Sequence, residues 1–224
     1  RPYRLRSAAF TDRVGEIVAV SLESGVQSLY TSFLVLLPED RAVVHKPANV
    51  TFEQAALRTA QLAYDLRIRP AVFYSWPSGG DVDGYAADEA TIEASCRAIT
   101  EFMARLDQCA LSAGTTLHVL AHSMGNRALL SALGTIVLRM SKRGRSSLDR
   151  IVFAAPYVDA RVFLQALAEI DPLGKNKTLY ASERDKAVWL SKALHKYARA
   201  GLIPPVTVAP GLDTINAAGV DDTF

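Results

Sequence analysis

The segment 115–138 constrains the fold more than any other part of the sequence. An apolar run rich in strand-forming residues ends just before Ser123, which has Ala121 two positions before it and Gly125 two positions after it. Apolar residues at helical spacing follow directly. The pattern therefore predicts a strand over 115–121, a sharp turn with a hydroxyl at its apex, and then a helix.

The sequence small-x-Ser-x-Gly between a strand and a helix is typical of a nucleophile elbow, where the two backbones come so close that the flanking residues must be small. Such a turn would hold Ser123 in sparsely populated backbone angles, at a cost of roughly 1–3 kcal/mol. The alternative is that the pattern occurs by chance and that Ser123 is a buried turn former. The strand-to-helix context favours the elbow.

With 224 residues, of which 50% are hydrophobic, the chain can form one α/β domain, and we expect a single domain over 1–224. A formal net charge of +2 is too small to indicate a nucleic-acid or membrane-surface partner. The longest uncharged stretches, 114–126 and 128–138, are shorter than the roughly 18 apolar residues of a membrane span. A cytoplasmic location is expected, although a targeting segment could have been removed ahead of Arg1. The sequence does not indicate an oligomeric state.

Cys96 and Cys109 fall on one long predicted helix. At about 1.5 Å of rise per residue they would lie roughly 20 Å apart, which is beyond the reach of a disulfide. Two lone cysteines do not make a metal site either. We expect neither a metal nor an organic cofactor.

The chain begins with apolar runs separated by brief turns and then alternates between strand and helix. The turns predict an antiparallel meander over 14–22, 26–37 and 41–45. Further strands are expected at 71–75, 115–121, 150–154, 177–181 and 206–209. Helices are expected at 51–66, 86–111, 128–138, 158–170 and 186–199, the first with a capping box from Thr51 to Gln54. The alternation predicts an α/β fold: a mostly parallel sheet with antiparallel N-terminal strands and helices on both faces.

Four segments occur in an order that resembles a largely bacterial α/β-hydrolase family of unknown function. They are Tyr74-Ser75-Trp76-Pro77-Ser78, Ala121-His122-Ser123-Met124-Gly125-Asn126, Thr178-Leu179-Tyr180-Ala181-Ser182 with Asp185, and Gly211-Leu212-Asp213-Thr214-Ile215. The likeness covers roughly residues 49–224. It implies the α/β-hydrolase fold, whose elbow follows the fifth strand, as 115–121 does here. Only about one helix is expected between the sixth and seventh strands, so we expect no large cap.

The resemblance implies a Ser-His-Asp triad with Ser123 as the nucleophile and Asp185 as the acid. Asp185 follows the strand at 177–181, at the sheet edge where the sites of such folds collect. The alternative is a carboxylate that only stabilises a helix N-terminus. Asp159 is the second candidate for the acid, and close to it this chain has Tyr157 where the family tends to have an aspartate.

The base of the triad is the open question, because none of the four histidines follows the last expected strand. His118 lies inside the elbow strand, His122 precedes the nucleophile with its side chain directed away, His195 lies on a helix, and His45 ends the third strand. The family's glycine-histidine-serine signature would fall just beyond Phe224. We therefore expect the C-terminal end to be truncated before the triad histidine. The competing interpretation is a real loss of the base.

One oxyanion donor should be the backbone N–H of Met124, at the start of a helix where the dipole assists. The second should come from the loop after the third strand, where the family has histidine-glycine-aromatic-asparagine. This chain has His45-Lys46-Pro47-Ala48-Asn49 there, one residue longer and without the glycine. Proline has no N–H, so Lys46 or Ala48 would have to donate.

Together these features predict an esterase-like serine hydrolase that cleaves a carboxylic ester or related acyl bond of a small molecule through an acyl-enzyme. His45, Trp76 and Tyr157 are the candidate pocket residues. The alternative is a catalytically impaired binding or scaffold protein, supported by the altered oxyanion loop, by Tyr157, and by Asn216 where the family tends to have an aspartate. A peptidase or amidase with the same triad is a third candidate.

Overall fold

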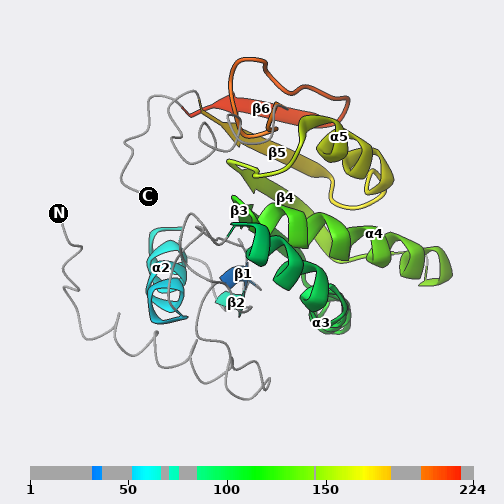
Figure 1. The fold of residues 1–224 in the computed structure, drawn as a ribbon. Helices are drawn as coiled ribbons and strands as arrows, with labels where there is room; N and C mark the ends of the chain where they lie inside the picture. Colours follow the sequence, from blue (N-terminus) through cyan, green and yellow to red (C-terminus); the bar gives the residue numbers. More distant parts are fainter. Residues whose placement is uncertain are drawn as a thin grey trace.

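The structure is a computed structural model, and it describes residues 32–36, 52–66, 71–75, 85–143, 145–182 and 198–217. Within these ranges, six strands form one sheet in the order β2-β1-β3-β4-β5-β6 (Figure 1). The strands are β1 (Ser32–Leu36), β2 (Ala71–Ser75), β3 (Leu117–His122), β4 (Leu148–Ala154), β5 (Asn176–Ala181) and β6 (Leu212–Asn216).

One of these strands runs against the others. β1 is antiparallel to both of its neighbours, β2 and β3, whereas β3, β4, β5 and β6 pair in parallel. Parallel neighbours require crossover connections, and a helix supplies the crossover from β3 to β4 and from β4 to β5. The expected α/β class is confirmed, and β1 is its antiparallel N-terminal strand.

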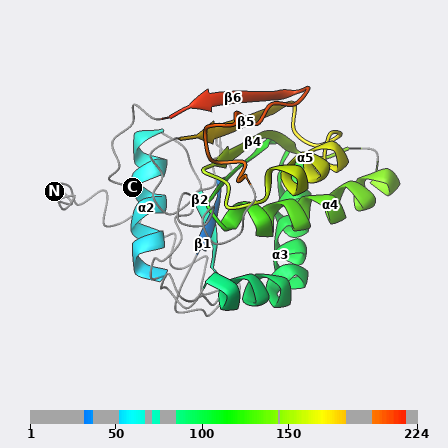
Figure 2. The same ribbon diagram turned by 45° about the horizontal axis from the view of Figure 1, so that its top comes forward.

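The described ranges contain four helices: α2 (Phe52–Asp65), α3 (Tyr85–Ala113), α4 (Gly125–Arg143) and α5 (Ala160–Glu169). Figures 1 and 2 show β1 and β2 between α2 on one side and α3 on the other, so helices cover both faces of this part of the sheet. The connection from β4 to β5, which is described throughout, contains α5 and no second helix. It leaves no room for a large cap, as predicted.

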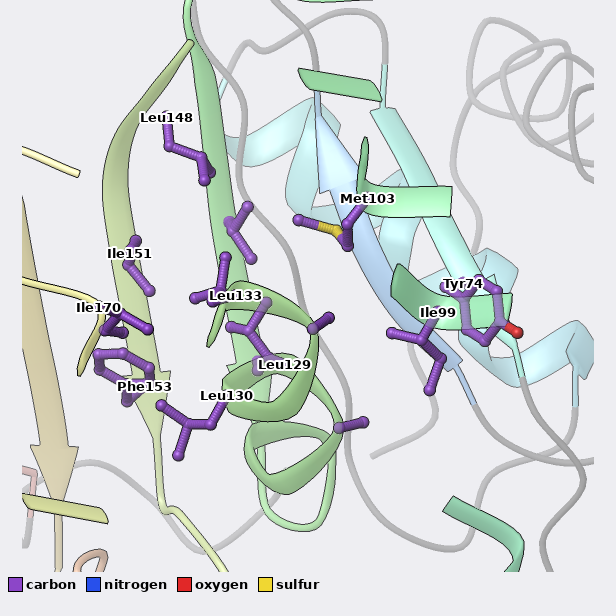
Figure 3. Close-up of a cluster of buried hydrophobic side chains, with 14 of the residues drawn as sticks. Tyr74, Ile99, Met103, Leu129, Leu130, Leu133, Leu148, Ile151, Phe153 and Ile170 are labelled. Carbon is purple, nitrogen blue, oxygen red and sulfur yellow. The ribbon is translucent and has the colours of Figure 1, made fainter. Parts of the chain in front are cut away.

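The core fills the space between the sheet and the layer formed by α3, α4 and α5, and it also includes buried alanines of α2. One face of β3 packs against this layer, because successive side chains of a strand point to opposite faces. The residues of that face are fully buried: Leu117, Val119 and Ala121. Figure 3 shows the leucines of α4 beside the buried residues of β4: Leu129, Leu130, Leu133, Ile151 and Phe153. The ring of Phe153 also meets the ring of Phe163 edge to face at 5.1 Å, which holds α5 against β4. This packing fixes the ends of β3 and β4 relative to each other.

Most elements agree with the sequence. The helices expected at 51–66 and 86–111 are α2 and α3, and the strand expected at 71–75 is β2. Cys96 and Cys109 are free thiols on α3, as their spacing predicts.

Two expectations near the C-terminal end are wrong. Residues 206–209 form no strand, and the last described strand is β6 instead. Val206 and Val208 are 51% and 67% exposed, because a segment flanked by prolines without N–H groups does not pair with the sheet. The helix expected over 186–199 does not extend to its predicted end, since Arg199 pairs with Asp159 in an antiparallel β-bridge.

Other expectations fall on parts of the chain that are not described. The strands predicted at 14–22 and 41–45 lie outside the described residues, and so does the predicted helix up to residue 197. The predicted run 26–37 contains β1.

Candidate active site

A two-residue turn joins β3 to α4. β3 ends at His122 and α4 begins at Gly125, so Ser123 and Met124 form the turn. Ser123 has a φ of +49°, in the left-handed region that costs a non-glycine residue about 1–2 kcal/mol. The predicted strand, turn and helix are present, and the strain is at the serine.

The backbone of Ser123 is tied to β4 and to the loop that follows it. The N–H of Ser123 donates to the carbonyl oxygen of Ala154 at 3.0 Å. The carbonyl oxygen of Ser123 accepts from the N–H of Tyr157 at 3.1 Å and from the N–H of Asn126 at 3.2 Å. A strained conformation persists only where the surroundings over-determine it, and these bonds hold both polar backbone groups of Ser123.

The side chain of Asn126 adds a bridge at the same place. Its Nδ2 donates to the carbonyl oxygen of Ser123 at 3.0 Å and to that of Ala154 at 3.1 Å. The residue is 0% exposed, and its Oδ1 has no hydrogen-bond partner in the described part of the chain. A reversed amide would direct Oδ1 at two carbonyl oxygens, so the bonds determine which way the amide points. Asn126 ends the segment 121–126 that carries the family resemblance, but nothing in the sequence indicates this role.

Two polar groups of the turn are not used by this network. Ser123 is 5% exposed, and its Oγ makes no hydrogen bond to any described residue. The N–H of Met124 likewise has no acceptor among the described residues. It lies at the N-terminal end of the 19-residue helix α4, where the dipole favours negative charge. A hydroxyl next to such an N–H is an arrangement suited to acyl transfer.

The sequence matches one family model over residues 40–221, a range that includes this turn. That family is described as alpha/beta hydrolase of unknown function (DUF900). The chain belongs to DUF900. The resemblance stated from the sequence motifs is thereby confirmed, and so is the hydrolase-type fold. No curated protein and no solved structure matches the chain.

In this DUF900 chain, the loop after β4 brings Tyr157 next to Ser123 through its backbone. The ring of Tyr157 is 2% exposed, and the guanidinium carbon of Arg199 lies 4.4 Å from its centroid, which is a cation–π geometry. Arg199 is itself buried. The sequence predicts Tyr157 as a pocket residue, and in the structure its ring packs against Arg199 while its backbone N–H donates to Ser123.

The segment 198–203 covers the same loop. The N–H of Gly201 donates to the carbonyl oxygen of Pro156 at 3.2 Å, and its own carbonyl oxygen accepts from the N–H of Ser182 at 3.0 Å. A Cβ on Gly201 would lie 2.5 Å from the carbonyl carbon of Ala155, so only glycine fits there. Ala155 has a φ of +41°, and its strained conformation is held from this side. The sequence predicts a helix over the first part of this segment, up to residue 199, and carries no signal for its place beside the loop.

Asp159, the second candidate for the acid, caps α5. Its Oδ1 accepts hydrogen bonds from the N–H groups of Arg161 at 2.9 Å and Val162 at 3.3 Å, and from Nε of Arg161 at 3.3 Å. Burial by itself raises the pKa of Asp159, but these hydrogen bonds and the charge of Arg161 outweigh it, so the pKa lies below its ordinary value. The described contacts of this carboxylate are those of a helix N-cap.

Of the predicted site residues of this DUF900 member, the structure brings together Ser123, Met124 and Tyr157. The others lie outside the described residues: His45, Trp76 and Asp185. Within the described ranges, His118 has its Nδ1 3.6 Å from Oδ2 of Asp149 on β4.

The described ranges hold no group of three or more histidine, cysteine, aspartate or glutamate side chains that could bind a metal ion. None of the helices in these ranges has the length and apolar character needed to cross a bilayer.

Proposed function

We propose that this chain is an esterase-like serine hydrolase that cleaves a carboxylic ester or related acyl bond of a small molecule, with Ser123 as the nucleophile. Membership of an alpha/beta hydrolase family supports the reaction class. The observation that carries the proposal is the state of Ser123, which sits at a φ of +49° between β3 and α4 with a hydroxyl that no described residue engages. Strain of this kind collects at functional sites, because a purely structural turn would accept glycine at lower cost.

The proposed reaction proceeds in two halves. Oγ of Ser123 attacks the acyl carbon while its proton passes to a histidine base, and collapse of the tetrahedral intermediate expels the alcohol, which takes that proton. Water then attacks the acyl-serine ester, gives its proton to the histidine, and releases the carboxylic acid as the serine hydroxyl is restored.

Negative charge on the tetrahedral intermediate requires donors that are already in place. We assign the N–H of Met124 as one donor, since it begins α4 and has no acceptor among the described residues. The second donor is assigned to Lys46 or Ala48, from the sequence of their loop. Loss of a single donor of this kind typically lowers the rate by about 10²–10³.

Asp185 is the proposed acid, and its role is to orient the histidine that the family's pattern has after the last strand. Asp159 is the weaker candidate because its Oδ1 already accepts the N–H groups of Arg161 and Val162 at the start of α5. Asp185→Asn should therefore slow the reaction by two or more orders of magnitude, because the imidazole would lose the partner that sets its tautomer. Asp159→Asn, which preserves an N-cap, should leave the rate near that of the wild type.

A fluorophosphonate probe tests the nucleophile in the full-length protein. We expect labelling at Ser123, identified by peptide mass analysis, and none with Ser123→Ala. Ser131→Ala is the matched control, because Ser131 lies on the helix α4 that follows the turn and its Oγ donates a hydrogen bond to Sγ of Cys96, away from the turn. Labelling that persists in Ser123→Ala would assign the reaction to another residue.

Absence of labelling in the full-length protein would favour the alternative, a binding or scaffold protein that has lost its chemistry. The buried ring of Tyr157 against Arg199, where the family tends to have an aspartate, is consistent with that alternative. If labelling occurs, comparison of short-chain esters with peptide amides separates an esterase from a peptidase or amidase.

A further inference from the structure

The carbonyl oxygen of Ser123 accepts three hydrogen bonds. One comes from the N–H of Tyr157 at 3.1 Å, and two come from Asn126, from its N–H at 3.2 Å and from its Nδ2 at 3.0 Å. Since a carbonyl oxygen has two lone pairs, this group has more donors than its own satisfaction requires. Two donors would already satisfy this oxygen, so the third donor must have another role.

That carbonyl and the N–H of Met124 belong to the same peptide group. The cis peptide bonds of the described chain are elsewhere, before Pro204 and Pro205, so the bond between Ser123 and Met124 is trans. A trans peptide group is planar, and its C=O and N–H point in opposite directions. Whatever fixes the direction of the Ser123 carbonyl also fixes the direction of the Met124 N–H.

Hydrogen bonds to the carbonyl oxygen of a peptide group also make the N–H of the same group a stronger donor. Each bond accepted by a carbonyl polarises its peptide group and strengthens the hydrogen bonds of that group by about 10–30%. Three donors on the Ser123 carbonyl would therefore make the Met124 N–H a better partner for a developing negative charge, with no further reorganisation during the reaction.

Asn126 also bonds to the acceptor of the other polar backbone group of Ser123, its N–H. Its Nδ2 donates at 3.1 Å to the carbonyl oxygen of Ala154, which is the acceptor for the N–H of Ser123. A closed ring results, running from the N–H of Ser123 to Ala154, through the amide of Asn126, and back to the carbonyl of Ser123. The amide nitrogen of one completely buried side chain thus holds both sides of the strained residue.

From this geometry we propose that Asn126 is a positioning residue for the oxyanion donor Met124. It acts through the peptide group between Ser123 and Met124 and does not touch the substrate. The proposal rests on the proposed function, because it assigns a part of that reaction. Substitution of Asn126 should therefore lower the rate of the chemical step and change substrate binding little.

Asn126→Asp is the sharpest variant, because aspartate has the same shape but places an acceptor where Nδ2 donates. Asn126→Leu is the second variant, and it removes the donor without adding charge. For each we expect the kcat for an activated ester and the rate constant of fluorophosphonate labelling to fall by about 10–100-fold, less than the 10²–10³ of outright donor loss. KM should change by no more than about threefold, since Asn126 is completely buried and in this proposal does not touch the substrate.

Leu133→Ala is the matched control for stability. Leu133 is fully buried on the same helix, and its truncation lowers Tm without touching the carbonyl of Ser123. All proteins are compared well below their Tm. Leu133→Ala should label at the wild-type rate, whereas both Asn126 variants should label slowly whatever their Tm.

Labelling of either folded Asn126 variant at the wild-type rate, with the wild type itself labelled at Ser123, would overturn the positioning role and leave the proposed function intact. A parallel loss of rate in Leu133→Ala would also overturn it, because the effect would then follow stability alone. A wild-type protein that is not labelled would overturn the proposed function and this inference together.

Discussion

The backbone N–H of Tyr157 donates to the carbonyl oxygen of Ser123 at 3.1 Å, so the loop after β4 supports the turn after β3. The two loops meet because β3 and β4 are parallel neighbours whose last residues, His122 and Ala154, are in register. Parallel strands deliver their carboxyl ends to the same edge of a sheet. The loop is in turn held by the segment 198–203, so distant parts of the chain determine the conformation of the proposed nucleophile.

Gly201→Ala should strongly destabilise the protein. The new Cβ would lie 2.5 Å from the carbonyl carbon of Ala155 and 2.6 Å from the nitrogen of Pro156, and backbone atoms cannot move aside cheaply. We expect the free energy of unfolding to fall by about 3 kcal/mol or more, as in severe overpacking, measured by urea denaturation. Fluorophosphonate labelling should slow as well, because the loop that contacts Ser123 must shift.

Gly134→Ala is the matched control for that substitution. Gly134 lies inside α4, and the nearest atom to its new Cβ would be Oε2 of Glu169 at 4.0 Å. Alanine should raise the free energy of unfolding by about 0.5–1 kcal/mol, through helix propensity. Equal effects of the two substitutions would contradict the close contact at Gly201.

Ser123→Gly should be more stable than Ser123→Ala, although glycine is usually the less stable choice next to a helix. A φ of +49° strains any residue with a Cβ, and glycine removes that strain. We expect a difference of about 0.5–1 kcal/mol in the free energy of unfolding, after allowance for the greater entropy of glycine in the unfolded chain. Chemical denaturation of both variants tests it, and a less stable glycine variant would contradict the strained turn.

Asp107→Ala should weaken the connection between α3 and β4. The buried carboxylate accepts from Oγ of Ser146 at 2.8 Å, from the N–H of Ser147 at 2.7 Å and from Oγ of Ser147 at 2.6 Å. Loss of a charged acceptor shared by three donors should lower the free energy of unfolding by about 2–3 kcal/mol. The control is Glu101→Ala on the same helix, which loses only an exposed pair with Arg97 and should cost about 0.5 kcal/mol or less. A similar decrease in the free energy of unfolding in both variants would contradict the expected contribution of the buried hydrogen bonds to Asp107.

The contribution of Asp159 to stability should depend on pH. Its pKa is lowered in the folded protein because the hydrogen bonds from Arg161 and Val162 outweigh burial, so the ionised form is favoured by folding. That stability is present above the unfolded-state value of about 4 and is lost as the pH falls through the lower folded-state pKa. Asp159→Asn keeps the cap but does not titrate. The stability difference between wild type and variant should therefore shrink between about pH 7 and about pH 2, and a constant difference would contradict the assignment.

Local patterns were sufficient to predict most elements. The compact apolar run of β2 and the long periodic helix α3 carry their signals within their own residues, so their positions followed from the sequence. The position of the last strand could not be predicted in this way. Residues 206–209 look as strand-like as β6, and the choice between them depends on pairing with β5, which periodicity does not contain.

The sequence by itself determined that a strand would turn sharply into a helix at Ser123, because the small flanking residues and the apolar periodicities lie within one continuous stretch. Only the tertiary structure decided what holds that turn. The acceptor Ala154, the donor Tyr157 and the close contact of Gly201 come from other strands and loops, and the amide of Asn126 acquires its role only when β4 lies beside β3. Such hydrogen bonds join groups remote in the chain, and their partners are fixed by strand order and packing, which local sequence does not specify.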